Sequence, residues 1–582
     1  MNFFSTKRMN LHQARWYPNY WDTIALLIVL AVIALFAWNA KQMTTPYQLG
    51  QVIPISLNPR MLPLYAARTV VRMLLALVVS LLFTFIFGTW AAKSPRARRI
   101  IIPIIDILQS VPILGYLSVA IIAFIALFPG SELGPESATI FVIFTSQAWN
   151  MMLGFYQTMR SVPAEIKEAA RMMRLTPWQT FWRIEVPFSM PGLLWNTMVS
   201  MSASWFFVVA SEAMTVSNQQ ILLPGVGSYI AVAIQAANIR AICYAVLTMF
   251  IVIIIYDQLL FRPLVAWSEK FKTDREATDT DKESESWVVD LFRRTRFMRL
   301  VGLWLTSLFN AFVNIRFYTA MHSQQPPAHQ QSIHHRITSL IWLGLTFICG
   351  LAALTYLAIY LHNNFIWPEI GHVFILGLIT SFRVFIMIAI CSLIWVPIGV
   401  WIGLHPRVTR IAQPLAQILA AFPANLFYPF VVIFIVTFHL SPNIWLTPLM
   451  ILGSQWYILF NVIAGASSIP KDLFQVTANF NVKGKLRWLR LLLPAIFPFY
   501  VTGAITAAGG AWNASIVAEV ASWGKKTLTA TGLGAYITQN TSTGHFENIA
   551  LGIGMMCVLV LIFNRLIWRP LYDYAESRFT LD

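Results

Sequence analysis

Long apolar runs alternate with short polar segments along almost the whole chain of 582 residues. A membrane-spanning helix needs about 20 consecutive apolar residues, and twelve runs approach or exceed this length. They fall at 22–39, 64–91, 100–128, 138–157, 188–213, 241–261, 337–361, 372–404, 411–438, 443–463, 495–520 and 548–567. Several exceed about 20 residues, which predicts tilted helices or an unwound portion. The pattern predicts an all-α polytopic membrane protein with about twelve spans.

Composition supports this fold class. Apolar residues make up 57% of the chain and charged residues only 11%, whereas a soluble domain has about 25% charged residues. A soluble enzyme, a disordered protein and a disulfide-stapled secreted scaffold are therefore excluded. The four cysteines lie in apolar runs without a CxxC spacing, so we predict neither a disulfide framework nor a metal site.

The net charge of +17 is interpreted as membrane topology and not as a nucleic-acid-binding surface. With a cytoplasmic N-terminus, the segments predicted to lie inside hold 33 lysines and arginines, and the outside segments hold five. Three arginines remain within spans: Arg68, Arg72 and Arg383. Because basic residues accumulate on the cytoplasmic side of membrane proteins, this distribution predicts that both termini are cytoplasmic.

The central segment 265–336 is predicted to be a cytoplasmic linker. Its stretch Leu300–Val313 is apolar but short. We interpret this stretch as an interfacial amphipathic helix; the alternative is a thirteenth span, which would reverse the sidedness of everything after it. The linker histidines His322, His329, His334 and His335 could bind a metal, but we favour a solvated low-complexity segment.

The chain contains an internal repeat. Pro95–Pro103 matches Pro406–Pro414 at an offset of 311, and further along the offset becomes 307, as in Trp205 with Trp512 and Glu212 with Glu519. Six spans of the same sidedness occur twice, which predicts two parallel six-helix repeats with a pathway between them. The predicted units are 1–59 with the first span, the repeat 60–264, the linker 265–336, 337–369 with the seventh span, and the repeat 370–582.

A long polar segment between the fourth and fifth spans of each repeat is predicted to form an ordered cytoplasmic loop. We call residues 161–187 the first loop and residues 468–494 the second loop. In the first loop, Pro163 suits the start of a helix, and Glu165 and Glu168 lie near its positive end. Small and apolar residues at three-to-four spacing predict a narrow amphipathic face for close docking of a partner: Ile166, Ala169, Ala170 and Met173.

These loops resemble those of ABC importer permeases, whose motif is Glu-Ala-Ala, a glycine four residues later and a final Ile-x-x-Pro. The first loop reads Glu168-Ala169-Ala170 and ends at Ile184–Pro187, with Arg174 in place of the glycine. The second loop departs further, with Gln475-Val476-Thr477, then Asn481 and a final Pro494. Because asparagine tolerates a left-handed turn more readily than arginine, we expect the loops to persist with altered geometry.

The resemblance implies the type I importer permease fold and assigns coupling to an ATPase to the two loops. The residues carried over are Pro163, Glu165, Glu168, Ala169, Ala170, Arg174 and Pro187 in the first loop, and Pro470, Gln475, Thr477, Asn481 and Pro494 in the second. No GxxxxGK[ST] phosphate loop is present. The resemblance therefore implies that this chain is not an enzyme and carries no cofactor, and that ATP and Mg bind a separate cytoplasmic ATPase, present in two copies.

The sequence is most similar to the nitrate/sulfonate/taurine branch of that family, over roughly 60–264 and 370–575. The matching motifs are Val71-Arg72-Met73 and Phe382-Arg383-Val384, followed by Trp205…Glu212 and Trp512…Glu519 with a Gly-x-Gly after each. This resemblance implies a bacterial inner-membrane protein, an extracytoplasmic substrate-binding protein as a partner, and a small anion such as nitrate, sulfonate, taurine or bicarbonate as cargo.

The charged residues within spans have two interpretations. Arg72, Arg383, Glu212 and Glu519 could form a ring that meets the substrate, since intramembrane charges are functional candidates. They could instead pair within each half and brace two helices, which we favour. Other polar residues could line the pathway or bond between helices: Gln109, Ser110, Ser146, Gln147, Trp149, Asn150, Ser454, Gln455 and Asn513.

Two other functions remain open at this point. An ion-coupled carrier of the major-facilitator type also has twelve spans in two parallel halves, but it needs no ATPase-docking loops. A membrane-embedded enzyme would need a cluster of acid–base or metal-binding residues, which the spacing of His, Asp and Glu does not suggest.

Overall fold

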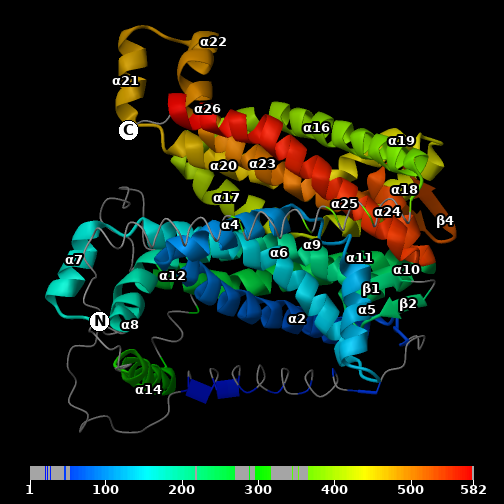
Figure 1. The fold of residues 1–582 in the computed structure, drawn as a ribbon, viewed down its shortest axis with the longest axis horizontal. Helices are drawn as coiled ribbons and strands as arrows, with labels where there is room; N and C mark the ends of the chain where they lie inside the picture. Colours follow the sequence, from blue (N-terminus) through cyan, green and yellow to red (C-terminus); the bar gives the residue numbers. More distant parts are fainter. Residues whose placement is uncertain are drawn as a thin grey trace.

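The computed structural model describes residues 53–268, 295–315 and 365–579, apart from 217–218, together with isolated residues elsewhere. Long helices of both halves lie side by side in one bundle (Figure 1). The predicted spans 22–39 and 337–361 lie largely outside the described residues. The protein is an all-helical, multi-pass membrane protein apart from two short hairpins.

The first half contains these elements in order: η2 (Pro59–Met61), α2 (Leu62–Phe83), η3 (Thr84–Gly88), α3 (Thr89–Lys93), α4 (Pro95–Ser110), α5 (Leu117–Leu127), α6 (Leu133–Arg160), α7 (Ala164–Met172), α8 (Pro177–Thr180), η4 (Phe181–Glu185), α9 (Val186–Glu212), β1 (Ala213–Val216), β2 (Gln219–Leu222), α10 (Val226–Gln235), α11 (Ile239–Tyr256), η5 (Asp257–Phe261) and α12 (Arg262–Ser268). The linker contributes α14 (Arg296–Val313).

The second half contains α16 (Trp367–Gly403), α17 (Pro406–Ala421), η7 (Ala424–Phe427), α18 (Tyr428–Thr437), α19 (Pro442–Trp445), η8 (Thr447–Met450), α20 (Trp456–Ser467), α21 (Lys471–Asn479), α22 (Gly484–Arg487), η9 (Trp488–Leu492), α23 (Leu493–Ala518), β3 (Val520–Trp523), β4 (Lys526–Thr529), α24 (Leu533–Thr543), α25 (Phe546–Phe563), η10 (Asn564–Trp568) and α26 (Arg569–Phe579). The order of elements repeats from α7 and α21 onward.

Within the described residues, seven helices are long and apolar enough to cross a membrane, or eight if the bent pair Pro406–Ala421 and Ala424–Thr437 is one span. Besides the run 411–438, which forms this bent pair, two predicted spans are divided differently. The run 100–128 is interrupted after Ser110, so α4 and α5 are separate helices, and the run 443–463 contains α19, η8 and the 12-residue α20. Prolines near these breaks lack the N–H that would continue the helix.

Two antiparallel hairpins were not predicted from the sequence. Strand β1 pairs with β2, and β3 pairs with β4. The hairpins lie at one end of the bundle, and α7 and α21 lie at the other end (Figure 1). Each strand is only four residues long, too short for an alternating pattern to stand out beside the apolar spans.

The prolines near the end of each loop do not interrupt the helix that follows. The continuous helices Pro177–Glu212 and Gly484–Ala518 contain Pro187 and Pro494. A π-helical turn directly precedes the final helical segment in both halves, at Phe181–Glu185 and Trp488–Leu492. Proline removes one i→i−4 hydrogen bond and crowds the preceding turn, and a wider π turn accommodates that disruption.

The two halves share their packing. The largest apolar cluster combines first-half residues such as Val142 and Phe207 with many residues of the second half. A second cluster is built mainly from the first half and includes Ala421 and Leu426. The backbone N–H of Ile113 also donates to Asn513 Oδ1 at 2.6 Å. The halves therefore meet along an extensive interface.

Candidate functional site

The two loops have the same backbone geometry. Helices α7 and α21 follow Pro163 and Pro470, and the second residue after each helix has positive φ: Arg174 at 52° and Asn481 at 51°. In the first loop Leu175 N donates to Ala170 O, and in the second Val482 N donates to Thr477 O. Both loops thus have a Schellman C-cap. Arginine adopts the left-handed conformation here despite its steric cost, so the two loops do not differ in backbone geometry; an altered geometry relative to the glycine-containing motif stays a prediction.

The exposed face of α7 differs from the predicted one. Glu165, Glu168 and Ala169 are exposed, but Ala170 is only 1% exposed. Ala170 therefore faces the loop's own interior and cannot offer its methyl group to a partner. The exposed surface continues through Met172, whose side chain is 87% exposed. In the second loop Gln475 and Val476 are exposed and Thr477 is partly buried. That the loops couple to an ATPase stays a prediction.

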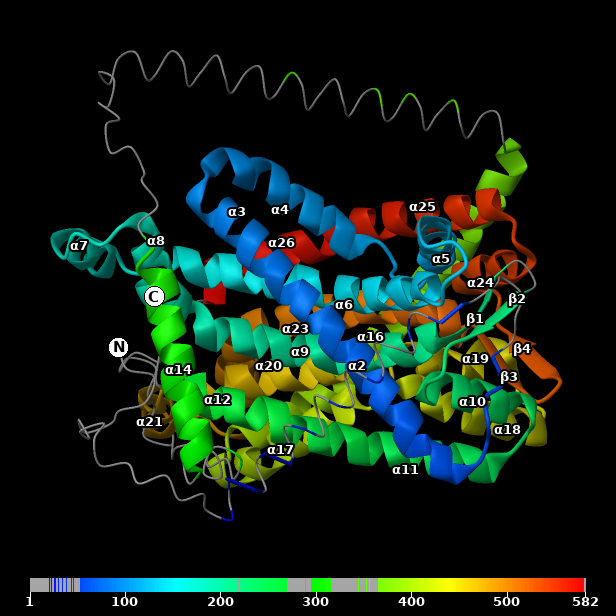
Figure 2. The ribbon, with the colours of Figure 1, turned by 90° about the horizontal axis from the view of Figure 1, so that it is seen from below.

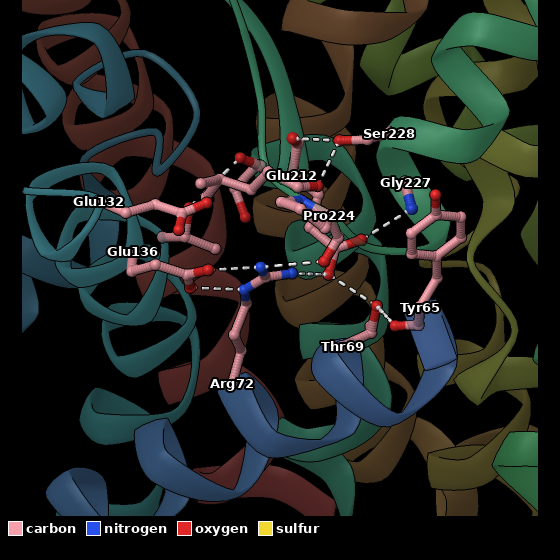
Figure 3. Close-up of polar contacts among 12 residues, drawn as sticks. Tyr65, Thr69, Arg72, Glu132, Glu136, Glu212, Pro224, Gly227 and Ser228 are labelled. Carbon is pink, nitrogen blue, oxygen red and sulfur yellow. Dashed lines mark hydrogen bonds and ion pairs between the residues drawn. The ribbon is translucent and has the colours of Figure 1, made fainter. Parts of the chain in front are cut away.

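A buried charge cluster lies at the opposite end of the first half, beneath the β1–β2 hairpin (Figure 3). Arg72 on α2 donates Nε and one terminal nitrogen to Glu136 on α6, both at 2.6 Å. Its other terminal nitrogen donates to Glu212 at the end of α9, also at 2.6 Å. All three side chains are almost completely buried. A bidentate guanidinium–carboxylate contact fixes geometry as well as charge, so the cluster connects three helices.

Neutral groups complete the coordination of Glu212. Its carboxylate accepts from Thr69 Oγ1 at 2.6 Å and from Gly227 N at 2.7 Å. A Cβ on Gly225 would collide with this carboxylate, and a Cβ on Gly227 would collide with the Val209 carbonyl. The Gly-x-Gly motif after β2 is thus explained by close approach of the backbone to Glu212.

The second half contains a weaker version of the cluster. Arg383 donates to Glu519 at 3.3 Å, and Thr380 donates to the same carboxylate at 2.8 Å. The position equivalent to Glu136 is Asn443, whose Oδ1 accepts from Arg383 at 3.1 Å. Its other donor is the backbone N–H of Thr531, at 2.7 Å. The formal charges of Arg72, Glu136 and Glu212 sum to −1, whereas those of Arg383, Glu519 and Asn443 sum to zero.

Sequence reasoning paired each arginine with the glutamate on α9 or α23 but missed Glu136. The signal that could have revealed Glu136 was the 307-residue offset. It aligns Glu136 with Asn443, so the first half has an acidic residue near the start of a span where the second half has an amide. The cavity described below is not lined by Arg72, by Arg383 or by the glutamates that pair with them. The geometry favours a helix-bracing role over a substrate-contacting one.

The two tryptophans of the repeated motif pack within the protein. Trp205 is 1% exposed and makes an edge-on contact with Tyr256, with ring centroids 5.5 Å apart. Trp512 is buried in the largest apolar cluster. Several polar candidates bond between helices: Ser146 with Ser204 at 2.7 Å, and Asn150 with Ser200 at 3.0 Å. These residues stabilise helix packing.

Two adjoining pockets lie between the halves, lined mainly by α9 of the first half and by α17, α20 and α23 of the second, and they share Ser202, Ala420, Gly453 and Tyr457. We call them together the inter-half cavity. Its polar lining consists of Trp195, Ser202, Gln413, Gln417, Tyr428, Ser454, Trp456 and Tyr457. The Ser454 hydroxyl is buried and has no hydrogen-bond partner among the described residues. Among the described residues that line this cavity, none carries a formal charge.

Comparisons with known proteins match both halves. The family model described as "Binding-protein-dependent transport system inner membrane component" matches residues 84–262 and again 395–580. The glycine betaine/proline betaine transport system permease protein ProW of Escherichia coli is 28% identical over 160 residues, covering 27% of this chain and 43% of that protein. The chain thus spans less than half the length of this relative.

Two cyanobacterial proteins are also similar. The nitrate import permease protein NrtB of Synechocystis is 24% identical over 246 residues, covering 41% of this chain and 84% of NrtB. The bicarbonate transport system permease protein CmpB of Synechococcus elongatus is 25% identical over 179 residues, covering 31% of this chain and 61% of CmpB. The similarity thus lies among membrane components of transport systems.

Proposed function

Because this chain belongs to the family of binding-protein-dependent transport system inner membrane components, we propose that it is the permease of an ATP-binding-cassette importer, with both halves fused in one chain. The observation that carries the proposal is the pair of loops, which share one geometry and lie at the same end of the bundle (Figure 1). An ion-coupled carrier has no need of two such loops.

We infer that the inter-half cavity is part of the substrate pathway. It lies at the interface of the two parallel repeats, where such a pathway is expected. Amide, hydroxyl and indole groups of its lining can donate hydrogen bonds to an anion. Uncharged donors bind a small anion weakly enough for it to leave again, which transport requires.

The proposed cargo is a small anion of the nitrate, sulfonate, taurine or bicarbonate type. The support is the similarity to permeases named for nitrate and bicarbonate, together with a cavity whose described lining includes no carboxylate to repel an anion.

The proposed partners follow from the same function. Two copies of a cytoplasmic ATPase, which bind ATP and Mg, would dock on α7 and α21. An extracytoplasmic binding protein would deliver cargo at the hairpin end of the bundle. In this arrangement the protein lies in a bacterial inner membrane with both termini in the cytoplasm.

The test is to purify the tagged chain from its native membranes and to identify the proteins that remain bound. We expect an ATPase at two copies per chain. After reconstitution with its binding protein, the complex should take up nitrate, bicarbonate or taurine only when ATP is present inside, where the loops face. Glycine betaine is the control substrate. Uptake driven by an ion gradient without ATP would contradict the proposal.

A further inference from the structure

The linker helix α14 lies directly against the first loop. The indole Nε1 of Trp178 donates to the Phe312 carbonyl at 3.1 Å. Just after the helix, Asn314 Oδ1 accepts from Arg183 at 2.8 Å and from Gln179 at 3.4 Å. Two kinds of group on the loop, an indole and a guanidinium, therefore hold the C-terminal end of α14.

Aromatic packing reinforces this contact. The Phe312 ring meets Trp178 and Trp182 edge-on, with centroid distances of 5.1 and 5.6 Å. The Phe309 ring meets Trp182 at 5.9 Å with perpendicular planes. Edge-to-face pairs at such distances contribute to stability beyond their buried area. The contact is thus a cluster of partly exposed aromatic rings with polar bonds at its edge.

The second half provides an internal control. At the 307-residue offset, Trp178 and Trp182 correspond to Lys485 and Leu489, whereas Arg183 corresponds to Arg490. Leu486 and Leu489 are each 52% exposed. The aromatic residues that receive α14 are therefore specific to the first loop, although the backbone of the two loops is the same.

The position of α14 agrees with an interfacial helix. It runs across the long helices rather than along them (Figure 2), and Trp304 and Leu308 on its surface are exposed. Figure 1 shows it beside α8, far from α21 and α22 on the other side of the bundle. Only the first loop is covered by this helix in the part of the chain that the structure describes.

We propose that α14 is a built-in partner of the first loop, so that the fused chain offers the two ATPase copies unequal docking surfaces. If α7 and α8 move, α14 must move with them or its contacts with the first loop must break. No such contact with α14 restricts α21 and α22 in the part of the chain that the structure describes. The claim that the two docking surfaces are unequal rests on the proposed function. The claim that α14 braces the first loop does not depend on it.

Hydrogen exchange of the purified chain, without any ATPase, tests the bracing. Asn314 is exposed at the end of α14, so its replacement leaves the bundle intact. Asn314→Leu removes the acceptor for Arg183 and should raise amide exchange in 176–185 by about tenfold, because local opening reports the loss of such contacts. Asn314→Asp keeps the acceptor and should retain wild-type protection. Leu489→Ala, at the position equivalent to Trp182, is the control in the second loop and should leave amide exchange of 483–492 unchanged, because that side chain is 52% exposed.

Equal exchange of 176–185 in the wild type, in Asn314→Leu and in Phe312→Ala would overturn the bracing, because the first variant removes the polar bonds and the second removes ring contacts. Cross-linking to the bound ATPase then tests the inequality, with single cysteines at Met172 and at the equivalent Asn479. We expect the two yields to differ in the wild type and to converge in Asn314→Leu. Equal wild-type yields would overturn the inequality, and failure of any ATPase to bind would refute the proposed function while the exchange result still decides the bracing.

Discussion

Glu136 and Asn443 occupy equivalent positions in the two halves, yet only Glu136 forms an ion pair with the arginine beside it. The first half therefore holds its arginine between two carboxylates. The second half holds Arg383 between one carboxylate and an amide, and leaves it more exposed. The duplicated halves kept the same bracing position but not the same strength of bracing.

The first prediction is that Glu136→Gln destabilises the protein by about 1.5–3 kcal/mol, because Arg72 loses a bidentate bond to a carboxylate while Glu212 still compensates its charge. Asn443→Ala is the matched control and should cost less, because its hydrogen bonds from Arg383 and Thr531 are exposed to solvent. Thermal unfolding of the purified protein in detergent measures both. Equal losses in the two variants would show that Glu136 does not contribute through its charge.

The second prediction concerns Arg383 and Glu519. Glu519→Gln and Arg383→Gln should each lower the melting temperature, and the double variant should lose less than their sum, because no unpaired charge remains. A double-mutant cycle measures this coupling. Additive stability effects combined with weaker uptake would instead favour a substrate-contacting role for both residues.

The third prediction is that Arg174→Gly stabilises the protein by about 0.5–1 kcal/mol. Positive φ strains a residue with a Cβ by about 1–2 kcal/mol, and part of that gain is offset by the greater backbone freedom of glycine in the unfolded chain. Asn481→Gly should gain less, since asparagine tolerates this conformation. A melting temperature that falls in Arg174→Gly would contradict the strain argument.

The fourth prediction separates folding of the first loop from docking. Ala170→Asp places a charge at a buried position, so exchange of the α7 amides should rise even in the isolated chain. Ala169→Asp places the same charge on the exposed face, so it should abolish ATP-driven uptake while exchange of α7 stays normal. Normal uptake by a well-expressed Ala169→Asp variant would remove this face of α7 from the docking surface.

The fifth prediction is that Gln417→Leu raises the KM for anion uptake about tenfold, because one hydrogen-bond donor of the inter-half cavity is lost. Leu415→Ala is the control, since Leu415 is an exposed position of the same helix that does not line the cavity. Vesicle uptake measured against substrate concentration compares the two. An unchanged KM in Gln417→Leu would exclude this side chain from cargo binding.

Much of this fold could be predicted because its signals are local. A membrane span is visible in about 20 consecutive residues, and a repeat is visible as a constant offset. Residues such as Glu212 and Glu519 stand out because charge is rare within a span. Because these signals are local, the helical class and the duplication follow from the sequence alone.

Tertiary structure decided the features that depend on which elements meet. Glu136 pairs with Arg72 only because α6 packs beside α2 beneath a hairpin. The spacing of residues within one helix does not predict that contact. Ala170 is buried because the chain turns back over it after Arg174. The pairing of Asn314 with Arg183 joins residues 131 positions apart. Contacts between distant segments are set by packing of the whole chain, so the sequence by itself determined the helices and the duplication, and the tertiary structure decided how the duplicated halves differ.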